Sequence, residues 1–337
     1  MSKTQSNAQA LPLEAMTTQP KQPRLSGAWR TYLGLAQALT AMILLFGFLS
    51  EHFLTMETFR TIANELPVLT VLAVGMTYVL IISGIDLSVG SVLALAGSVL
   101  SLAMMRWNLG IVAAIPLSLL VGASCGLLTG MITVRWALPS FIVSLGMLEI
   151  ARGGAYIVTN SRTEYIGSAV EAISAPLVFG ISPAFIIAVL IAIVGQIVLT
   201  RTVFGRYMIG IGCNEEAMRL AGINTKPIKV TVFALSGLLA AVGALFQVSR
   251  LEAADPNAGA GLELQVIAAV VIGGASLMGG RGSVINTFFG VLIISVLESG
   301  LAQIGASEPT KRIITGAVII VAVVLDIYRS RKAAAKH

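Results

Sequence analysis

Long apolar runs alternate with short polar stretches along almost the whole chain. Most of these runs are close to the roughly 20 residues that an α-helix needs to cross a bilayer. They are rich in Leu, Ala, Ile and Gly, and none shows the strict apolar–polar alternation of a membrane β-strand. The pattern therefore predicts transmembrane helices at ten places: 32–49, 66–82, 88–105, 110–133, 138–158, 181–199, 230–247, 264–280, 284–301 and 313–327.

The eighth run, 264–280, is the weakest of the ten. It is short and ends in a glycine-rich stretch that contains Gly273, Gly274, Gly279 and Gly280. Irregular backbone at membrane depth is tolerated where it is buried in protein or lines a water-filled cavity. We therefore expect a broken or re-entrant segment here.

Composition agrees with a membrane location. Hydrophobic residues make up 56% of the chain and charged residues 11%, and the mean hydropathy is +0.90. A soluble domain carries about 25% charged residues, so this chain could not cover its surface in water. The predicted fold class is an all-α polytopic membrane protein, a bundle of about ten transmembrane helices. Residues 1–31 are predicted to be a disordered cytoplasmic tail, 32–327 the membrane domain, and 328–337 a basic cytoplasmic tail.

The distribution of basic residues predicts the orientation. With the N-terminus inside, 15 Lys and Arg residues fall in inner segments and six in outer ones. Inner loops of membrane proteins carry this excess of positive charge. The bias requires an even number of spans, because an odd number would place the basic stretch 329–336 outside. The net charge of +6 thus indicates topology and gives no support for nucleic-acid binding.

Motifs for catalysis are missing from the sequence. The glycine-rich stretch 273–282 lacks the Gly-Lys-Ser/Thr ending that holds phosphates, and there is no His-Glu-x-x-His. The two cysteines and two histidines form no metal-binding cluster. We expect a chain that is not an enzyme and has no cofactor or metal of its own.

The stretch Ser83-Gly84-Ile85-Asp86-Leu87-Ser88-Val89-Gly90 places a carboxylate between the second and third runs. A charge at the bilayer centre costs about 2.5–3.5 kcal/mol on insertion scales. The presence of Asp86 at this position therefore requires an explanation. One interpretation is that Asp86 or Ser88 caps the third helix by accepting bonds from its free amides at the inner surface. The other places Gly84, Asp86, Ser88 and Gly90 at the inner gate of a translocation path.

Two further features lie within the predicted spans. Glu149 and Arg152 are three residues apart in the fifth run, which makes them neighbours on a helix. They are expected either to neutralise each other as an ion pair or to contact a transported substrate. Gly122, Gly126 and Gly130 recur every four residues in the fourth run, and such a stripe favours close packing of two helices.

The longest inner loop, 200–229, contains a short amphipathic helix by its residue pattern. Asn214 is a good N-cap, the acidic residues after it suit the positive end of a helix dipole, and Gly222 suits a C-terminal stop. Such a helix could dock into a groove of a partner or lie on the membrane. Its candidate docking residues are Asn214, Glu215, Glu216, Ala217, Arg219, Leu220, Ala221 and Gly222, of which Ala217, Leu220 and Ala221 form a small apolar face.

At these residues the chain resembles the membrane permeases of bacterial ABC-type sugar importers, in the ribose, arabinose and xylose group. The resemblance extends from about Leu66 to Ile327, with the ribose permeases as the nearest group. It departs from them at Gln265-Val266, where Asp-Ala is expected. Three stretches carry it: SGIDLSVGSVLA at 83–94, GCNEEAMRLAGI at 212–223 with Lys226–Lys229, and LELQVIAAVVIGGASLMGGRGS at 262–283.

The resemblance implies a homodimer of permease subunits in the bacterial inner membrane. A cytoplasmic ATPase with two nucleotide-binding halves would bind ATP and Mg, and a periplasmic sugar-binding protein would deliver the substrate. Residues 214–222 would be the helix that couples to the ATPase. The transported sugar would be a monosaccharide, with ribose the first expectation.

The sequence leaves two alternatives open. The same architecture could import another pentose, a hexose, a sugar alcohol or a sugar-like signal. The chain could instead be an autonomous channel or a secondary transporter, although it lacks the series of mid-span carboxylates that ion coupling requires.

Overall fold

The computed structural model describes residues 26–177 and 180–334, so the predicted tail at 1–31 lies mostly outside the described residues. Nearly all of the described chain is helical. The helices are α1 (Ser26–Leu49), α2 (Met56–Ile81), α3 (Val89–Met105), α4 (Ile111–Arg135), α5 (Ser140–Thr159), α6 (Pro183–Arg201), α7 (Val203–Leu220), α8 (Thr225–Leu251), α9 (Leu262–Ile272), α10 (Val284–Gln303) and α11 (Glu308–Ala334). A 3₁₀ helix, Ser168–Ile173, and two short strands, β1 (Glu164–Tyr165) and β2 (Ala253–Ala254), complete the described elements.

Each predicted apolar run forms a helix, and α7 is the additional helix of the 200–229 loop. Among the described residues, six helices are long and apolar enough to cross a membrane: α2, α4, α5, α6, α8 and α10. The apolar part of α1, together with α3 and α9, forms shorter apolar helices. The polytopic helical fold is therefore confirmed, whereas the count of about ten spans and the cytoplasmic position of both termini stay predictions. Where a basic tail was predicted at 328–337, α11 continues to Ala334.

The eighth run is broken, as its glycines predicted. α9 has only 11 residues, which is about 16 Å of helix against a hydrocarbon core of about 30 Å. Gly274, Gly279 and Gly280 have positive φ angles, which glycine adopts readily and other residues rarely do. The chain therefore leaves the helix after Ile272 and continues irregularly until α10 begins.

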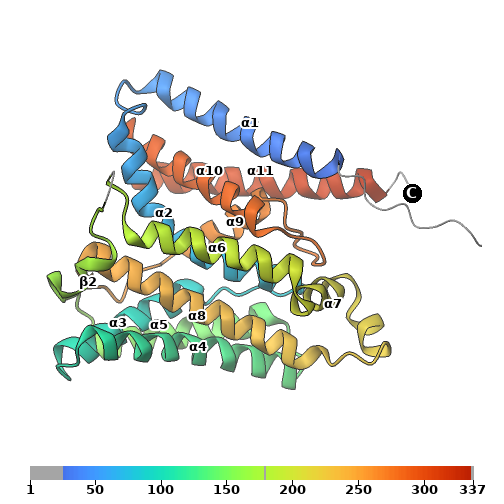
Figure 1. Ribbon diagram of the computed structural model, residues 1–337, viewed down its shortest axis with the longest axis horizontal. Helices are drawn as coiled ribbons and strands as arrows, with labels where there is room; N and C mark the ends of the chain where they lie inside the picture. Colours follow the sequence, from blue (N-terminus) through green and yellow to red (C-terminus); the bar gives the residue numbers. More distant parts are fainter. Residues whose placement is uncertain (1–25, 178–179, 335–337) are drawn as a thin grey trace, which may run out of the picture.

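The bundle has a buried centre and a more exposed side. Figure 1 shows α1, α10 and α11 along one side, α3, α4 and α5 along the other, and α6 and α8 between them. In the most apolar stretch of α2, 89% of the residues are buried, against 22% in α4, α5 and α6. Because the exposed residues of those three helices are mostly Leu, Ile, Val and Phe, their exposed surfaces are suited to lipid or to another membrane subunit.

The glycine stripe of α4 packs against α8, as predicted. A Cβ atom on Gly122 would overlap the carbonyl oxygen of Gly237, and one on Gly126 would overlap that of Phe233. At Gly130 a Cβ atom would lie 3.0 Å from the Cβ atom of Phe233. The two backbones approach this closely because the glycines have no side chains.

The connections at one end of the bundle are tied together by a small sheet. β1 pairs antiparallel with β2, with Glu164 opposite Ala254 and Tyr165 opposite Ala253. Arg106, just after α3, forms an ion pair of 2.6 Å with Glu164, and Ser101 donates to the same carboxylate. Figure 1 shows β2 at one end of the bundle and α7 at the other.

Candidate functional site

The predicted helix of the 200–229 loop begins at Asn214. Within α7 the backbone leaves helical geometry at this residue, with φ −163° and ψ 96°, so a separate short helix follows. The Asn214 side-chain oxygen accepts a hydrogen bond of 2.9 Å from the backbone amide of Ala217. This bond satisfies one of the free amides of the first turn, which confirms the predicted N-cap.

The short helix ends at Gly222, also as predicted. Gly222 has a φ angle of +81°, and its amide donates to the carbonyl of Arg219. The next amide, of Ile223, donates to the carbonyl of Met218 over 3.1 Å. This pair of bonds is the Schellman motif, which satisfies the last carbonyls of a helix and requires a left-handed residue at the glycine position.

The helix 214–222 presents its apolar side chains outward. Ala217, Leu220 and Ala221 all reach the surface, and Leu220 is 82% accessible. The other side faces the protein, where Met218 packs against the main apolar core. An exposed leucine on a helix with both ends capped is suited to a groove on another protein or to the membrane surface.

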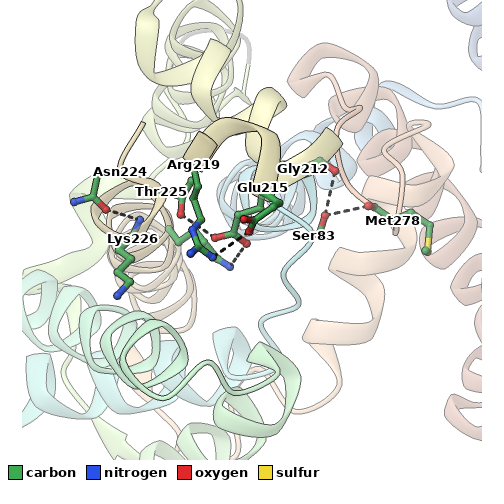
Figure 2. Close-up of polar contacts among 10 residues, drawn as sticks. Ser83, Gly212, Glu215, Arg219, Asn224, Thr225, Lys226 and Met278 are labelled. Atoms are coloured by element: carbon green, nitrogen blue, oxygen red, sulfur yellow. Dashed lines mark hydrogen bonds and ion pairs between the residues drawn. The ribbon is translucent and has the colours of Figure 1, made fainter. Parts of the chain in front are cut away.

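Glu215 fixes the short helix to the start of α8. Its carboxylate accepts a hydrogen bond from Lys229 Nζ at 3.0 Å. It also accepts one from Thr225 Oγ1 at 2.8 Å, as Figure 2 shows. Partial burial tends to raise the pKa of Glu215, but the bonds from Lys229 and Thr225 and the positive charges of Lys229 and Arg219 outweigh it. The pKa of Glu215 therefore lies below its ordinary value of 4.5.

A three-way contact joins the short helix to two other segments. Gly212, just before the helix, lies against Ile81 at the end of α2 and against Gly280 in the 273–283 loop. Ser83 donates to the carbonyls of Met278 at 3.0 Å and Gly212 at 3.4 Å, as Figure 2 shows. We call this group, Ile81, Ser83, Gly212, Gly279 and Gly280, the glycine junction.

Glycine is required at this junction because backbone meets backbone. A Cβ atom on Gly212 would overlap the Ile81 carbonyl oxygen and the Gly280 amide nitrogen, and one on Gly279 would overlap Ser83 Oγ. The Gly280 amide also donates to the Ile81 carbonyl over 2.9 Å. Displacement of the helix 214–222 would therefore act directly on the end of α2 and on the 273–283 loop.

From the junction the chain continues without regular structure through the 82–88 segment, which runs alongside α5. The amides of Ile85 and Leu87 donate to Ser140 Oγ and Ser144 Oγ, at 2.9 and 3.0 Å. Serines thus satisfy backbone groups that no helix satisfies, which is required inside a membrane protein. α3 begins only after this segment, at Val89.

The structure corrects the predicted role of Asp86 as a helix cap at the inner surface. Asp86 is 1% exposed and accepts from the amide and hydroxyl of Ser88, at 3.0 and 2.6 Å, and from Ser236 Oγ at 2.9 Å. Ser88 precedes the helix, and neither side chain accepts from an amide within α3. Ser236 lies about 16 Å along α8 from its first residue. Asp86 therefore lies deep in the bundle, where it joins the 82–88 segment to α8.

A second irregular segment, 252–261, meets the first. Gly259 packs against Gly90 in the first turn of α3 so closely that a Cβ atom on either would collide with the other backbone. Tyr156 donates to the side-chain oxygen of Asn257 over 2.6 Å. One of the two interpretations of the sequence placed Gly84, Asp86, Ser88 and Gly90 at a gate, and neither predicted that 252–261 would contact this stretch. The turn residues Asp255, Pro256 and Asn257, with two following glycines, were the available signal.

The predicted ion pair between Glu149 and Arg152 is wrong. Arg152 donates to the carbonyls of Pro256 at 2.5 Å and Ala258 at 2.8 Å, and no ion pair joins it to Glu149 in the described part of the chain. Glu149 is exposed on α5. The arginine stabilises the 252–261 segment, whose carbonyls no helix satisfies, and this explains a charged residue within a span.

Polar residues also surround a cavity of about 620 Å³ between the first half of α2, the starts of α9 and α11, and the end of α10. Gln265 donates to Glu298 across it over 2.6 Å. The sequence did not predict this cavity, because its walls come from four separate helices. The polar residues of its lining include Glu57, Thr58, Thr61, Glu65, Gln265, Glu298, Gln303, Glu308, Lys311 and Arg312.

Within residues 26–177 and 180–334, no three side chains of His, Cys, Asp or Glu gather into a group that could hold a metal ion. The expectation that this chain has no cofactor of its own stays a prediction.

Comparison with known proteins assigns most of the predicted membrane domain to a family. Residues 58–323 match the family described as the permease component of the branched-chain amino acid transport system. The chain belongs to this permease family. No solved structure matches the chain.

Several curated relatives align over nearly their whole length. The ribose import permease protein RbsC of Escherichia coli strain K12 is 37% identical over 92% of this chain and 99% of the relative. The L-arabinose ABC transporter permease protein AraH of Azospirillum brasilense is 32% identical over 90% of each. The fructose import permease protein FrcC of Rhizobium meliloti is 31% identical over 88% of this chain and 85% of the relative.

These findings confirm the predicted family and location. The chain is a permease of the ABC sugar-import group and, with six candidate spans among its described residues, a multi-pass protein of the bacterial inner membrane. Its relatives are transport subunits and not enzymes by themselves.

Proposed function

We propose that this chain forms the translocation path of an ATP-driven importer for a monosaccharide, with ribose as the first candidate. The observation that carries the proposal is the helix 214–222, capped at both ends, fixed by Glu215 and exposing Leu220. The relative RbsC, a ribose import permease by name, supports the choice of substrate. Both termini and the helix 214–222 would lie on the cytoplasmic side, with about ten spans between the termini.

The geometry supports a mechanical link between this helix and the membrane interior. A partner that moves the helix 214–222 would move Gly212 against Ile81 and Gly280, since their backbones are in contact. The 82–88 segment starts at the same point and carries Asp86 into the bundle. Tightly packed contacts do not deform continuously. A small displacement at one of them therefore moves the packed segments together, from one arrangement to another.

The candidate gate residues differ in how they could act. Asp86 and Ser88 are buried and hydrogen-bonded to each other, and Gly84 and Gly90 permit close packing around the 82–88 segment. We propose that this segment and the 252–261 segment, held by Arg152, form the gate. Glu149 is exposed on α5 and would contact substrate only if a second copy of the chain covered it.

The proposal includes partners. An ATPase with two nucleotide-binding halves would bind ATP and Mg and take up the helix 214–222, and a periplasmic sugar-binding protein would contact the opposite end. A second copy of this chain would complete the path. A neutral sugar needs hydroxyl, amide and backbone partners and no chain of charges. Nucleic acid has no part in this function.

The test is uptake of labelled ribose by cells that lack their own ribose importer. These cells would express this chain with the ATPase and the binding protein that the proposal requires, and a second strain would lack only this chain. We expect accumulation that requires this chain and stops with an inactive ATPase. Uptake that continues without ATP hydrolysis would overturn the mechanism and favour a channel or a secondary transporter.

A point variant tests the docking helix separately. Leu220→Asp places a charge on the exposed face, so we expect the permease to insert normally but to lose co-purification with the ATPase and transport. Leu220→Met is the matched control, because it keeps an apolar side chain of similar volume. Normal uptake by the Asp variant would refute docking through this face.

Another sugar is the second candidate, because relatives with the names of fructose and L-arabinose permeases align over almost the same length. Competition of ribose uptake by an excess of unlabelled arabinose, xylose, fructose and galactose would rank the substrates. Intact assembly without any ribose uptake would retain the permease and replace ribose.

A further inference from the structure

A cavity of about 750 Å³ opens beside the helix 214–222, where α4 ends and α8 begins. It is separate from the glycine junction and from the 82–88 segment, none of whose residues line it. Basic side chains come to it from three parts of the chain. Its charged lining residues are Arg135, Glu215, Arg219, Lys226 and Lys229.

Positive charge exceeds negative charge in this cavity. Lys229 is paired with Glu215, and Arg219 with Glu216 at 3.2 Å. In the described part of the chain, Arg135 and Lys226 have no acidic partner within 4.0 Å. The cavity also includes the first residues of α8, a long helix whose N-terminal end carries partial positive charge. These features together favour an anion.

One wall of the cavity contains a threonine hydroxyl without a hydrogen-bond partner. Thr133, in the last turns of α4, lines the cavity and is 6% exposed. Its side-chain oxygen has no hydrogen-bond partner, whereas Thr129 one turn earlier donates to the carbonyl of Cys125. Buried hydroxyl groups are normally satisfied, so Thr133 retains an unused donor in the wall of the cavity, which a rotation about its side-chain bond would turn toward the cavity.

The surroundings of the cavity match a lipid. The adjoining helices α4 and α5 are among the most exposed of the candidate spans, with 22% of their most apolar stretches buried. Trp136, Leu138 and Phe141, in the turn between these helices and just after it, are 63%, 44% and 45% exposed. Tryptophan is enriched where membrane proteins cross the lipid headgroup region. A basic cavity with such neighbours would hold the phosphate of a lipid while the acyl chains follow α4 and α5.

We propose that this cavity binds the phosphate headgroup of an anionic phospholipid such as phosphatidylglycerol. Placing that lipid in the cytoplasmic leaflet rests on the proposed orientation of the permease. The phosphate would contact Arg135 and Lys226, the two cations without an acidic partner among the described residues, and a rotation of Thr133 about its side-chain bond would let its hydroxyl donate. Bound lipid would thus stabilise the region that anchors the helix 214–222.

The experiment measures lipid retention by the purified complex of permease and ATPase. The complex is incubated with equal amounts of phosphatidylglycerol and phosphatidylethanolamine, and bound lipid is counted by native mass spectrometry. We expect phosphatidylglycerol to be preferred, and the double variant Arg135→Gln/Lys226→Gln to lower its retention roughly tenfold or more. Arg206→Gln is the matched control, because Arg206 is exposed on α7 but does not line the cavity.

Three results would overturn the proposal. The first is equal retention of the two lipids by the wild-type complex. The second is unchanged retention of phosphatidylglycerol by the double variant, whether or not that variant still binds the ATPase. The third is full displacement of the lipid by millimolar inorganic phosphate, which would indicate a site for free phosphate. The charge-preserving variant Arg135→Lys/Lys226→Arg should retain the lipid, which separates loss of charge from misfolding. The same measurement on the purified permease alone requires neither the ATPase nor sugar uptake, so failure of the proposed function would be seen separately.

Discussion

Replacing Gly212 with alanine should loosen the contact between the helix 214–222 and the membrane interior. The added Cβ atom would overlap two backbone atoms, the Ile81 carbonyl oxygen and the Gly280 amide nitrogen, and would lie 3.0 Å from Gly280 Cα. No rotation of a side chain can relieve this overlap. The backbones must separate, and the hydrogen bond from Gly280 to Ile81 would break.

The expected loss of stability has two parts. Breaking a backbone hydrogen bond costs about 1 kcal/mol net, and forcing extra volume into a packed contact costs about 1–3 kcal/mol. Gly212→Ala should therefore lower the free energy of unfolding by about 2–4 kcal/mol. It should also reduce sugar uptake per ATP hydrolysed, because the junction would no longer move as one unit.

The assay is unfolding of the purified permease in mixed micelles as sodium dodecyl sulfate is titrated in, monitored by circular dichroism. Gly146→Ala is the matched control. Gly146 lies within α5, and a Cβ atom added there would meet no other atom within 4 Å, so this variant should unfold like the wild type or slightly later. If Gly212→Ala and Gly146→Ala unfold within about 0.5 kcal/mol of each other, the rigid junction is refuted.

Three further predictions concern charged groups. Arg152→Gln should lower the free energy of unfolding by about 2 kcal/mol in the same assay, because charge-assisted bonds to two carbonyls of the 252–261 segment are lost; an unchanged transition would contradict this role. Asp86→Ala should cost about 3 kcal/mol by removing the acceptor of three donors, whereas Asp86→Asn should fold, and equal behaviour of the two variants would argue against the buried network. Because its pKa is lowered, Glu215 stabilises the fold above pH 4.5, and this contribution disappears as the pH falls through the folded pKa. The stability difference between wild type and Glu215→Gln, measured as a function of pH, should therefore vanish well below pH 4.5, and a difference that persists there would exclude the carboxylate as its source.

Local features were predictable from the sequence because they depend on neighbouring residues. Asn214 and Gly222 identified both ends of the short helix, since capping uses groups within a few residues of each other. The glycine-rich stretch after Ile272 predicted the broken eighth run for the same reason. The stripe of Gly122, Gly126 and Gly130 predicted close packing, but not that α8 is the partner.

The wrong predictions concern residues whose partners are far away in the chain. Spacing on one helix suggested that Arg152 pairs with Glu149, yet its acceptors are carbonyls more than 100 positions later. Asp86 was expected to cap the helix that follows it, but one of its partners is Ser236, 150 positions away. A sequence pattern shows which groups need a partner, whereas the packing of the bundle decides which partner is within reach.

Hydropathy and capping are local properties, so the residue pattern was enough to identify a helical membrane protein with a short capped helix outside its spans. The pattern did not show that Gly212, Ile81 and Gly280 form one junction, or that the 82–88 and 252–261 segments meet at Gly90 and Gly259. Nor did it show that Arg135 and Lys226 line one cavity. These contacts depend on how long helices pack against each other, and no stretch of sequence shorter than the whole bundle specifies that packing.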